Sequence, residues 1–271
     1  MNRPTIVLMT DFGVKDIYVG VMKGVIARIC PDATVIDLTH EIAPQSISTG
    51  AWALKNAYRY FPEGTIFLAV VDPDVGSERN PLAMEAGGYR FVAPDNGLLT
   101  HIIRTNDDIA AVAITNSRLW LPKVSATFHG RDIFAPAAAH LAAGIPLAEF
   151  GTPVTQFVEL DIAPAHQEGR RVVGSVIHID HFGNLITNIE PLVWGADRHL
   201  SLGDVQFPAP KAHVTILDTS IRGVQRAYYE SRAGDLLAQV DSTGALEIAV
   251  YRGSAAAYIG ASVGDTVVLE W

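Results

Sequence analysis

The pattern of apolar residues changes once along this chain, close to residue 160, and that change limits the folds open to it. In the first part, short apolar runs alternate with segments of helical spacing, in the order Thr5–Met9, Asp16–Ile29, Thr34–Leu38, Ser46–Tyr60 and Thr65–Val71. This alternation predicts an α/β fold, a layered domain in which helices cover a mostly parallel sheet. Continuous apolar strands of this kind are typical of strands buried on both faces.

The second part consists of short β-rich segments separated by glycine turns, from Arg171–Asp180 to Thr266–Glu270. Such segments predict a small antiparallel β-barrel or sandwich. Between the two parts, residues 161–170 (DIAPAHQEGR) are polar and contain proline and glycine. We therefore expect an α/β domain over residues 1–160, a linker over 161–170 and a β-barrel domain over 171–271.

Composition narrows the classes of function. The formal net charge is −9 and no Lys/Arg cluster is present, which argues against nucleic acid as a partner. Cys30 is the single cysteine, so neither an internal disulfide nor a cysteine-based zinc site can form. No apolar run reaches the roughly 18 to 20 residues needed to cross a membrane, and the N-terminus lacks the apolar core of a signal peptide. We expect a cytoplasmic protein.

Polar residues directly follow several apolar strands of the first part. Thr10-Asp11 follows the first strand, Asp72 follows TIFLAVV, and Pro94–Gly97 follows a further strand. In open α/β sheets, ligands bind beyond the carboxyl ends of the strands. These carboxylates and amides are therefore expected to meet at one edge of the sheet.

Seven motifs in order give a more specific signal. The chain resembles the S-adenosylmethionine hydroxide adenosyltransferase family, the water-using relatives of fluorinase and chlorinase. The resemblance covers essentially the whole chain through TDFG (10–13), DLTHEI (37–42), VVDPDVGSER (70–79), APDNGLL (93–99), TFHGRDIFAPAAA (127–139), HFGNLITNI (181–189) and LEIAVYRGSAA (246–256). It implies an α/β domain followed by a β-barrel domain, and homotrimers with active sites between subunits. It also implies an enzyme without metal or cofactor, which converts S-adenosylmethionine and water to adenosine and L-methionine.

The resemblance implies a catalytic cluster of Asp72, Arg79 and His129. Arg79 is always protonated and would hold Asp72 ionised. Asp72 and His129 could then orient one water molecule and take its proton, and the sequence leaves open which of them does so. Outside these motifs, three such residues would more often be a structural ion pair and a loop histidine.

The halogenating relatives help to choose the nucleophile. As the motifs line up, those relatives carry Tyr in place of Asp72 and Ser in place of Gly130. An anionic Asp72 at this spot would repel a halide ion. The chain also lacks the extra loop of the fluorinase type. Water is therefore the expected nucleophile.

The resemblance also implies substrate contacts. Asp11 matches a carboxylate that binds the two ribose hydroxyls. An ionised carboxylate suits this role because its two oxygens can accept a hydrogen bond from each hydroxyl. The residues matching groups near the methionine end are Asp16, Asp180 and Ser242. Those matching the adenine site are Phe182, Asn184 and the main chain from Val250 to Arg252. Asp74 and Tyr251 depart from the family pattern, where Gly and Asn are usual.

Three rival functions stay open on the sequence. A halogenase would form a 5′-halo-adenosine only when halide is present. A non-catalytic S-adenosylmethionine or adenosine sensor would not need the Asp72, Arg79 and His129 cluster. A metal-dependent nucleoside hydrolase would be sensitive to chelators. No metal site is expected, because the nearest candidate set (His178, Asp180 and His181) is split between a strand face and the residue beyond it.

Overall fold

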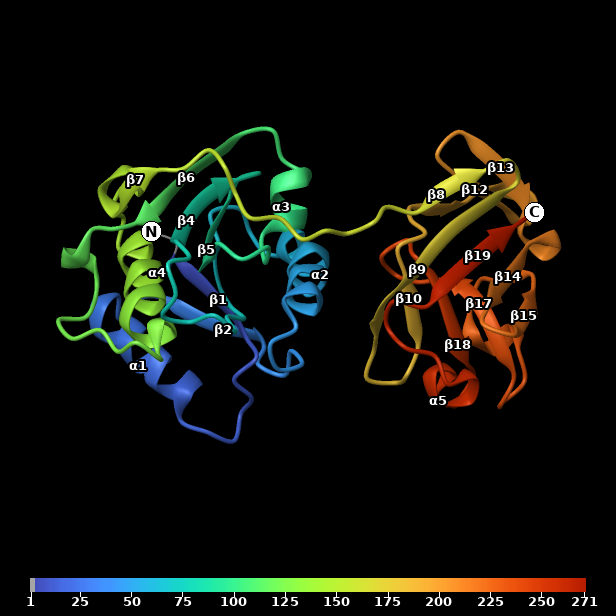
Figure 1. Cartoon of the computed structure of the whole chain (residues 1–271), viewed down its shortest axis with the longest axis horizontal. Helices are drawn as coiled ribbons and strands as arrows, with labels where there is room; N and C mark the ends of the chain where they lie inside the picture. Colours follow the sequence, from blue (N-terminus) through green and yellow to red (C-terminus); the bar gives the residue numbers. More distant parts are fainter. Residues whose placement is uncertain (1–2) are drawn as a thin grey trace. The chain divides into compact units, whose positions relative to one another are not determined.

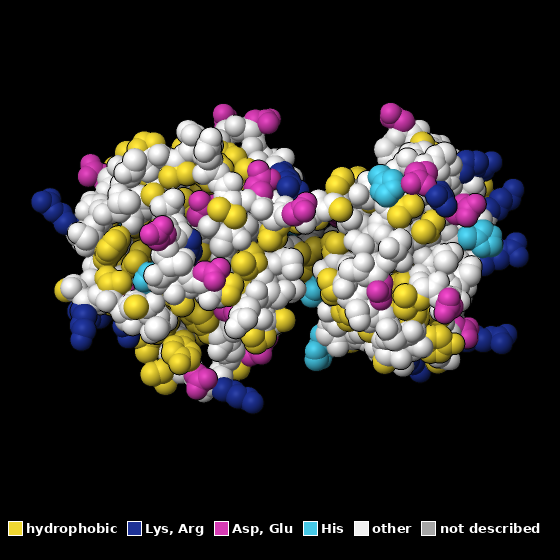
Figure 2. All heavy atoms as spheres, viewed as in Figure 1, with side chains coloured by type: hydrophobic (Ala, Val, Ile, Leu, Met, Phe, Trp, Pro, Cys, Tyr) yellow, Lys and Arg dark blue, Asp and Glu magenta, His cyan; other side chains and the backbone are white. Residues whose placement is uncertain are grey.

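The computed structural model describes residues 3–271 and divides the chain into two compact units, Met1–Asp161 and Ile162–Trp271. Each unit has a sheet of its own (Figure 1). Buried apolar side chains form a separate hydrophobic core in each unit. Figure 2 shows apolar, acidic and basic side chains interspersed over the visible face of each unit. No helix within residues 3–271 is both long and apolar enough to span a bilayer.

The first unit is built on a seven-stranded sheet of order β2-β1-β3-β5-β4-β6-β7. Its strands are β1 (Thr5–Thr10), β2 (Thr34–Thr39), β3 (Ile66–Val70), β4 (Pro81–Ala86), β5 (Tyr89–Pro94), β6 (Ile109–Ile114) and β7 (Gly151–Pro153). Its α-helices are α1 (Tyr18–Ile29), α2 (Ile47–Ala57), α3 (Thr100–Arg104) and α4 (Ala135–Ala142).

Helices cover both faces of this sheet (Figure 1). This explains the continuous apolar run in the middle of strand β1. Ile6 and Leu8 belong to the core cluster that contains α1 and α4 residues. Val7 and Met9 belong to the other cluster, which contains residues of α2 and α3. Because successive side chains of a strand point to opposite faces, both faces of β1 need apolar residues. Each such side chain contributes about 1.5–3 kcal/mol when fully buried.

The α/β expectation is confirmed, and the sheet is more mixed than expected. Strands β2, β1, β3 and β5 run parallel to their neighbours, whereas β5–β4, β4–β6 and β6–β7 pair antiparallel. The turn at Gly87-Gly88 joins β4 and β5 directly, and so short a connection can link only antiparallel strands. The sheet is therefore parallel only in the half that carries β1 and β3.

The second unit is built on a nine-stranded sheet that curls into a nearly closed barrel, with β15 against β17. Along this sheet the order is β15-β14-β19-β9-β10-β18-β17-β16, and β8 pairs with β9. The strands are β8 (His166–Glu168), β9 (Arg171–Ile179), β10 (Leu185–Thr187), β14 (His213–Ile216), β15 (Thr219–Arg222), β16 (Val224–Gln225), β17 (Leu236–Val240), β18 (Leu246–Val250) and β19 (Thr266–Glu270). Pairing is antiparallel except between β16 and β17.

Two features of this unit were not expected from the sequence. A separate three-stranded sheet is formed by β11 (Leu192–Trp194), β12 (His199–Leu202) and β13 (Val205–Pro208), and a short helix α5 (Ala255–Ile259) follows β18. Strand β8 lies inside the segment 161–170 that we expected to be a linker. Its polar side chains are exposed, so the pairing with β9 rests on main-chain hydrogen bonds that no apolar pattern could reveal.

Candidate active site

Asp72, Arg79 and His129 form one connected cluster in the first unit. Asp72 lies just beyond the carboxyl end of β3, and the Arg79 Nε atom lies 2.8 Å from its Oδ1. Arg79 Nη2 contacts Asp72 Oδ2 as well. The same Nη2 lies 3.1 Å from His129 Nδ1. The contacts predicted among these three residues are thus present.

The Arg79–His129 contact fixes the histidine tautomer. A guanidinium group has only donors, so His129 Nδ1 must accept and cannot carry a proton. The ring proton therefore sits on Nε2. Burial lowers the pKa of His129, and the nearby positive charge of Arg79 lowers it further, which agrees with a neutral ring.

The Asp72–Arg79 pair is withdrawn from water. The exposed fraction is 3% for the Asp72 side chain and 8% for Arg79. The guanidinium carbon also lies 5.3 Å from the centre of the Phe134 ring. A buried, doubly contacted pair of this kind holds its geometry but costs desolvation, so it is better suited to positioning a ligand than to stabilising the fold.

A close approach of two loops brings His129 to Arg79 across fifty positions of sequence. Gly76 has φ +87°, and a Cβ atom there would lie 2.4 Å from the Ala126 carbonyl oxygen. Only glycine fits this point, because both its backbone conformation and its space exclude a side chain. Asp74, which departs from the family pattern, is exposed in the same loop, where its carbonyl accepts the Ser77 N–H.

The sequence did not single out an aromatic cluster that contains Phe128, the residue before His129. The rings of Phe12, Tyr18 and Phe128 meet edge to face, with centroids 5.2 to 6.0 Å apart. With Arg131 and two hydroxyl residues they line a pocket of about 350 Å³. Phe12 lies in the TDFG motif and Phe128 in the TFHGRDIFAPAAA motif. This position inside two family motifs is the sequence feature that could have pointed to the cluster.

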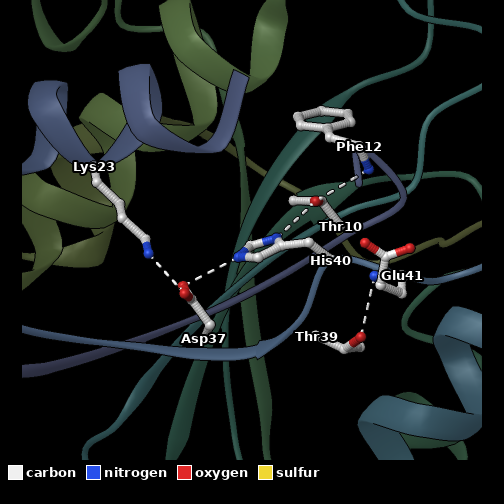
Figure 3. Close-up of polar contacts among 7 residues, drawn as sticks. All are labelled: Thr10, Phe12, Lys23, Asp37, Thr39, His40 and Glu41. Carbon is white, nitrogen blue, oxygen red and sulfur yellow. Dashed lines mark hydrogen bonds and ion pairs between the residues drawn. The ribbon is translucent and has the colours of Figure 1, made fainter. Parts of the chain in front are cut away.

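Asp11 is held in a turn that is anchored from two sides. Its carboxylate accepts the N–H of Gln45 at 2.8 Å, and Gln45 has the unusual φ of +66°. The turn itself is bound to His40: the Gly13 N–H donates to the His40 carbonyl, and His40 Nδ1 lies 2.8 Å from Thr10 Oγ1 (Figure 3). His40 is buried.

Behind His40, Asp37 and Lys23 extend the chain of contacts (Figure 3). His40 Nε2 lies 3.0 Å from Asp37 Oδ1, without hydrogen-bond alignment, and Lys23 Nζ lies 2.6 Å from Asp37 Oδ2. Partial burial raises the pKa of Asp37, but the hydrogen bond from Lys23 and the adjacent His40 ring outweigh it and leave the pKa below its ordinary value. An ionised Asp37 therefore supports the turn that carries Asp11.

The other residues predicted to contact the substrate lie in separate segments and differ in their exposure to solvent. Asp16 is exposed in the segment before α1. In the second unit, Ser242 is exposed in the turn between β17 and β18, Val250 is buried at the end of β18, and Arg252 is exposed with φ +61°. Of the predicted second-unit residues, the structure gathers only Asp180, Phe182 and Asn184 into one turn.

Asp180 organises that turn. Its Oδ1 accepts the N–H groups of Phe182 and Asn184, and its Oδ2 accepts from Asn184 Nδ2 at 2.9 Å. Gly183 has φ +81° and a Cβ there would lie 2.0 Å from Ser254 Oγ. The turn leaves Phe182 73% exposed while Asn184 is buried. Both carboxylate oxygens of Asp180 are thus already used within the protein.

No group of three or more His, Cys, Asp or Glu side chains suited to a metal occurs among residues 3–271. A mixed α/β unit with a partly buried Asp–Arg–His cluster, followed by a β-barrel unit, defines a two-unit protein equipped for small-molecule chemistry. The model of the SAM hydroxide adenosyltransferase N-terminal domain matches residues 6–151, and that of the C-terminal domain matches residues 174–268. The chain belongs to the SAM hydroxide adenosyltransferase family.

Individual relatives agree with this assignment. The (R)-S-adenosyl-L-methionine hydrolase of Salinispora tropica is 39% identical over 266 residues, which cover 97% of this chain and 96% of that protein. A fluorinase of Nocardia brasiliensis is 30% identical over 268 residues, which cover 85% of this chain and 88% of that protein. The crystal structure of an uncharacterised conserved protein from Thermotoga maritima superposes with a TM-score of 0.88 at 37% identity, covering 98% of this chain and 100% of the other.

Proposed function

We propose that this protein hydrolyses S-adenosyl-L-methionine to adenosine and L-methionine. Water forms a bond to C5′, the C5′–S bond breaks with its electron pair going to sulfur, and the attacking water loses one proton. The thioether leaves without charge, so no general acid is needed. The observation that carries the proposal is the Asp72–Arg79–His129 cluster, in a chain whose relatives include proteins named SAM hydrolase.

In this proposal Asp72 is the group that takes up the proton. His129 Nδ1 is occupied by Arg79 and Nε2 carries the ring proton, so His129 acts as a hydrogen-bond donor that orients the water. Each oxygen of Asp72 retains a second lone pair besides the one facing Arg79. Holding the water in line with the breaking bond supplies a further part of the rate.

The contacts to substrate are part of the same proposal. Asp11 binds the ribose hydroxyls, and its anchoring by Gln45 supports a fixed direction for that carboxylate. Phe182 and Asn184, with main-chain groups near Val250 and Arg252, bind adenine. Asp16, Asp180 and Ser242 serve the methionine end. We also propose a homotrimer on family likeness, with a mass in solution of about three times 29.1 kDa.

Halide is a poorer nucleophile in this proposal for two reasons. The buried carboxylate of Asp72 repels an anion at short range. In addition, a Cβ atom on Gly130 would lie 3.3 Å from the Phe12 ring and from Met22 Sδ, so the serine of the halogenating relatives would crowd this site.

The test is an incubation of purified protein with S-adenosylmethionine in oxygen-18 water, with EDTA, and with fluoride or chloride, followed by product analysis. We expect adenosine that carries the label, and methionine, in every arm. Unchanged substrate or methylthioadenosine would reject the proposal. Appearance of a 5′-halo-adenosine would favour the halogenase instead, and loss of activity with EDTA would favour a metal-dependent hydrolase.

A further inference from the structure

A hydrogen-bond chain runs through the wall of the barrel unit to Asn184. Glu247 on β18 and Gln239 on β17 are each 4% exposed, and Asn184 is 5% exposed. Glu247 Oε1 lies 2.7 Å from the Tyr228 hydroxyl and 2.6 Å from Gln239 Nε2. The Tyr228 hydroxyl in turn lies 3.3 Å from Asn184 Nδ2.

The carboxyl groups of Glu247 and Asp180, one at each end, set the direction of the hydrogen bonds in this chain. Burial raises the pKa of Glu247, and the hydrogen bonds from Tyr228 and Gln239 to its carboxylate oppose that rise. Glu247 Oε1 accepts the hydroxyl proton of Tyr228, so the Tyr228 oxygen is left to accept from Asn184 Nδ2. At the other end, Asp180 Oδ2 accepts the second N–H of the same nitrogen at 2.9 Å. An ionised carboxylate can only accept, so the Asn184 carboxamide must present its nitrogen to Asp180.

These contacts leave Asn184 Oδ1 as the atom of the carboxamide that can accept a hydrogen bond from a ligand. Both hydrogens of Asn184 Nδ2 are used within the protein, and no donor among residues 3–271 contacts Asn184 Oδ1. Turning the carboxamide over would set Oδ1 against the Asp180 carboxylate and the Tyr228 oxygen, which is unfavourable because the Asn184 side chain is buried. Asn184 is therefore held as a hydrogen-bond acceptor.

We propose that Asp180, Tyr228 and Glu247 are positioning residues that make this site select a purine with a 6-amino group over one with a 6-oxo group. The inference rests on the proposed function, because it takes Asn184 to contact the purine edge. An amino group donates to Asn184 Oδ1, whereas an oxo group would face an oxygen and leave both without a partner. A site built around a fixed polar group discriminates strongly against the analogue that cannot pair with it.

The experiment measures binding of adenosine and inosine to the full chain by calorimetry, which needs no turnover. The wild type should bind adenosine at least about tenfold more tightly than inosine. The double variant Asp180→Asn/Glu247→Gln keeps every side-chain shape but supplies a donor at each end of the chain. The carboxamide can then turn over, and the preference for adenosine should vanish or reverse.

Asp241→Asn is the matched control. Asp241 is also a turn carboxylate, accepting from the Thr243 main chain and hydroxyl and from Ala245, and it does not contact Asn184. It should keep the wild-type preference. If the double variant does not fold, Tyr228→Phe, compared with Tyr229→Phe at the exposed neighbouring position, interrupts the chain and should reduce the preference about three-fold or more.

An unchanged preference in the folded double variant, or in Tyr228→Phe, overturns the inference, as does a wild type that binds both nucleosides equally. The failure of the proposed function is separate. A protein that prefers adenosine but forms none from S-adenosylmethionine overturns the hydrolase assignment alone. A protein that hydrolyses S-adenosylmethionine but does not discriminate overturns the inference alone.

Discussion

Arg79 contacts both carboxylate oxygens of Asp72, and its Nη2 also donates to Nδ1 of His129. One guanidinium group therefore sets the orientation of the carboxylate and the tautomer of the imidazole together. It leaves Asp72 as the group able to accept a proton and His129 as a donor through Nε2. The first four predictions below follow from this arrangement.

Asp72→Asn should lower kcat by about 10²–10⁴-fold, the range usual for a positioned general base. Substrate binding should change little, because the variant keeps the size of the side chain. The measurement is steady-state release of adenosine together with direct binding of S-adenosylmethionine. Asp74→Asn, an exposed position in the same loop, is the control and should behave as wild type. Turnover within a few-fold of wild type in Asp72→Asn would remove Asp72 from the mechanism.

Arg79→Met should lower the free energy of unfolding by about 3–5 kcal/mol, because it leaves the Asp72 carboxylate buried without its partner. Urea denaturation measures this change. The matched control is Arg104→Met, which breaks the more exposed ion pair with Glu159. A surface pair of that kind contributes about 0–1 kcal/mol. Equal losses in the two variants would show that the Asp72–Arg79 pair is not specially dependent on its partner.

The stability contributed at His129 should fall at acidic pH. Burial and the charge of Arg79 lower its pKa below the ordinary value of 6.5, so the unfolded chain takes up a proton at a pH where the folded chain resists it. The effect is absent above pH 6.5 and grows as the pH falls from 6.5 through the folded pKa. The melting temperature of the wild type, minus that of His129→Asn, should shrink between pH 7.5 and pH 5.5.

The same shift predicts the pH dependence of activity. His129 must be neutral to accept from Arg79, so kcat/KM should stay level down to about pH 6.5 and fall only below it. The His129→Asn variant should lack this acidic limb, whatever its absolute rate. A wild-type limb centred above pH 6.5 would contradict the lowered pKa.

Gly130→Ser should destabilise the protein by about 1–3 kcal/mol, the usual cost of forcing atoms into a packed core. A Cβ atom at Gly130 would lie 3.3 Å from the Phe12 ring and from Met22 Sδ. Gly24→Ala is the control, because nothing lies within 4 Å of a Cβ atom at that exposed helical position. There we expect stabilisation of about 0.5–1 kcal/mol. Thermal unfolding of both variants measures the difference, and an unaffected Gly130→Ser would mean that the pocket accommodates a hydroxyl group.

The sequence by itself determined the strands and helices of the first unit from β1 to β3, and the family to which the chain belongs. A strand buried on both faces, such as the run Thr5–Met9, can be recognised in the sequence because nearly all of its consecutive residues must be apolar. The polar residues after β1 and β3 were identifiable for the same reason. The roles of Asp72, Arg79 and His129 in catalysis stay predictions, although their mutual contact was anticipated from the motifs.

Only the tertiary structure decided what depends on contacts between distant segments. The antiparallel pairing of β6 with β4 and the pairing of the polar strand β8 with β9 depend on main-chain hydrogen bonds, which leave no mark on apolar spacing. The His129 tautomer follows from an arginine fifty positions away, and the acceptor state of Asn184 follows from Tyr228 and Glu247. The direction of a hydrogen bond depends on which side chains are in contact in the folded protein. The sequence gives the residue types in order, but it does not give these contacts.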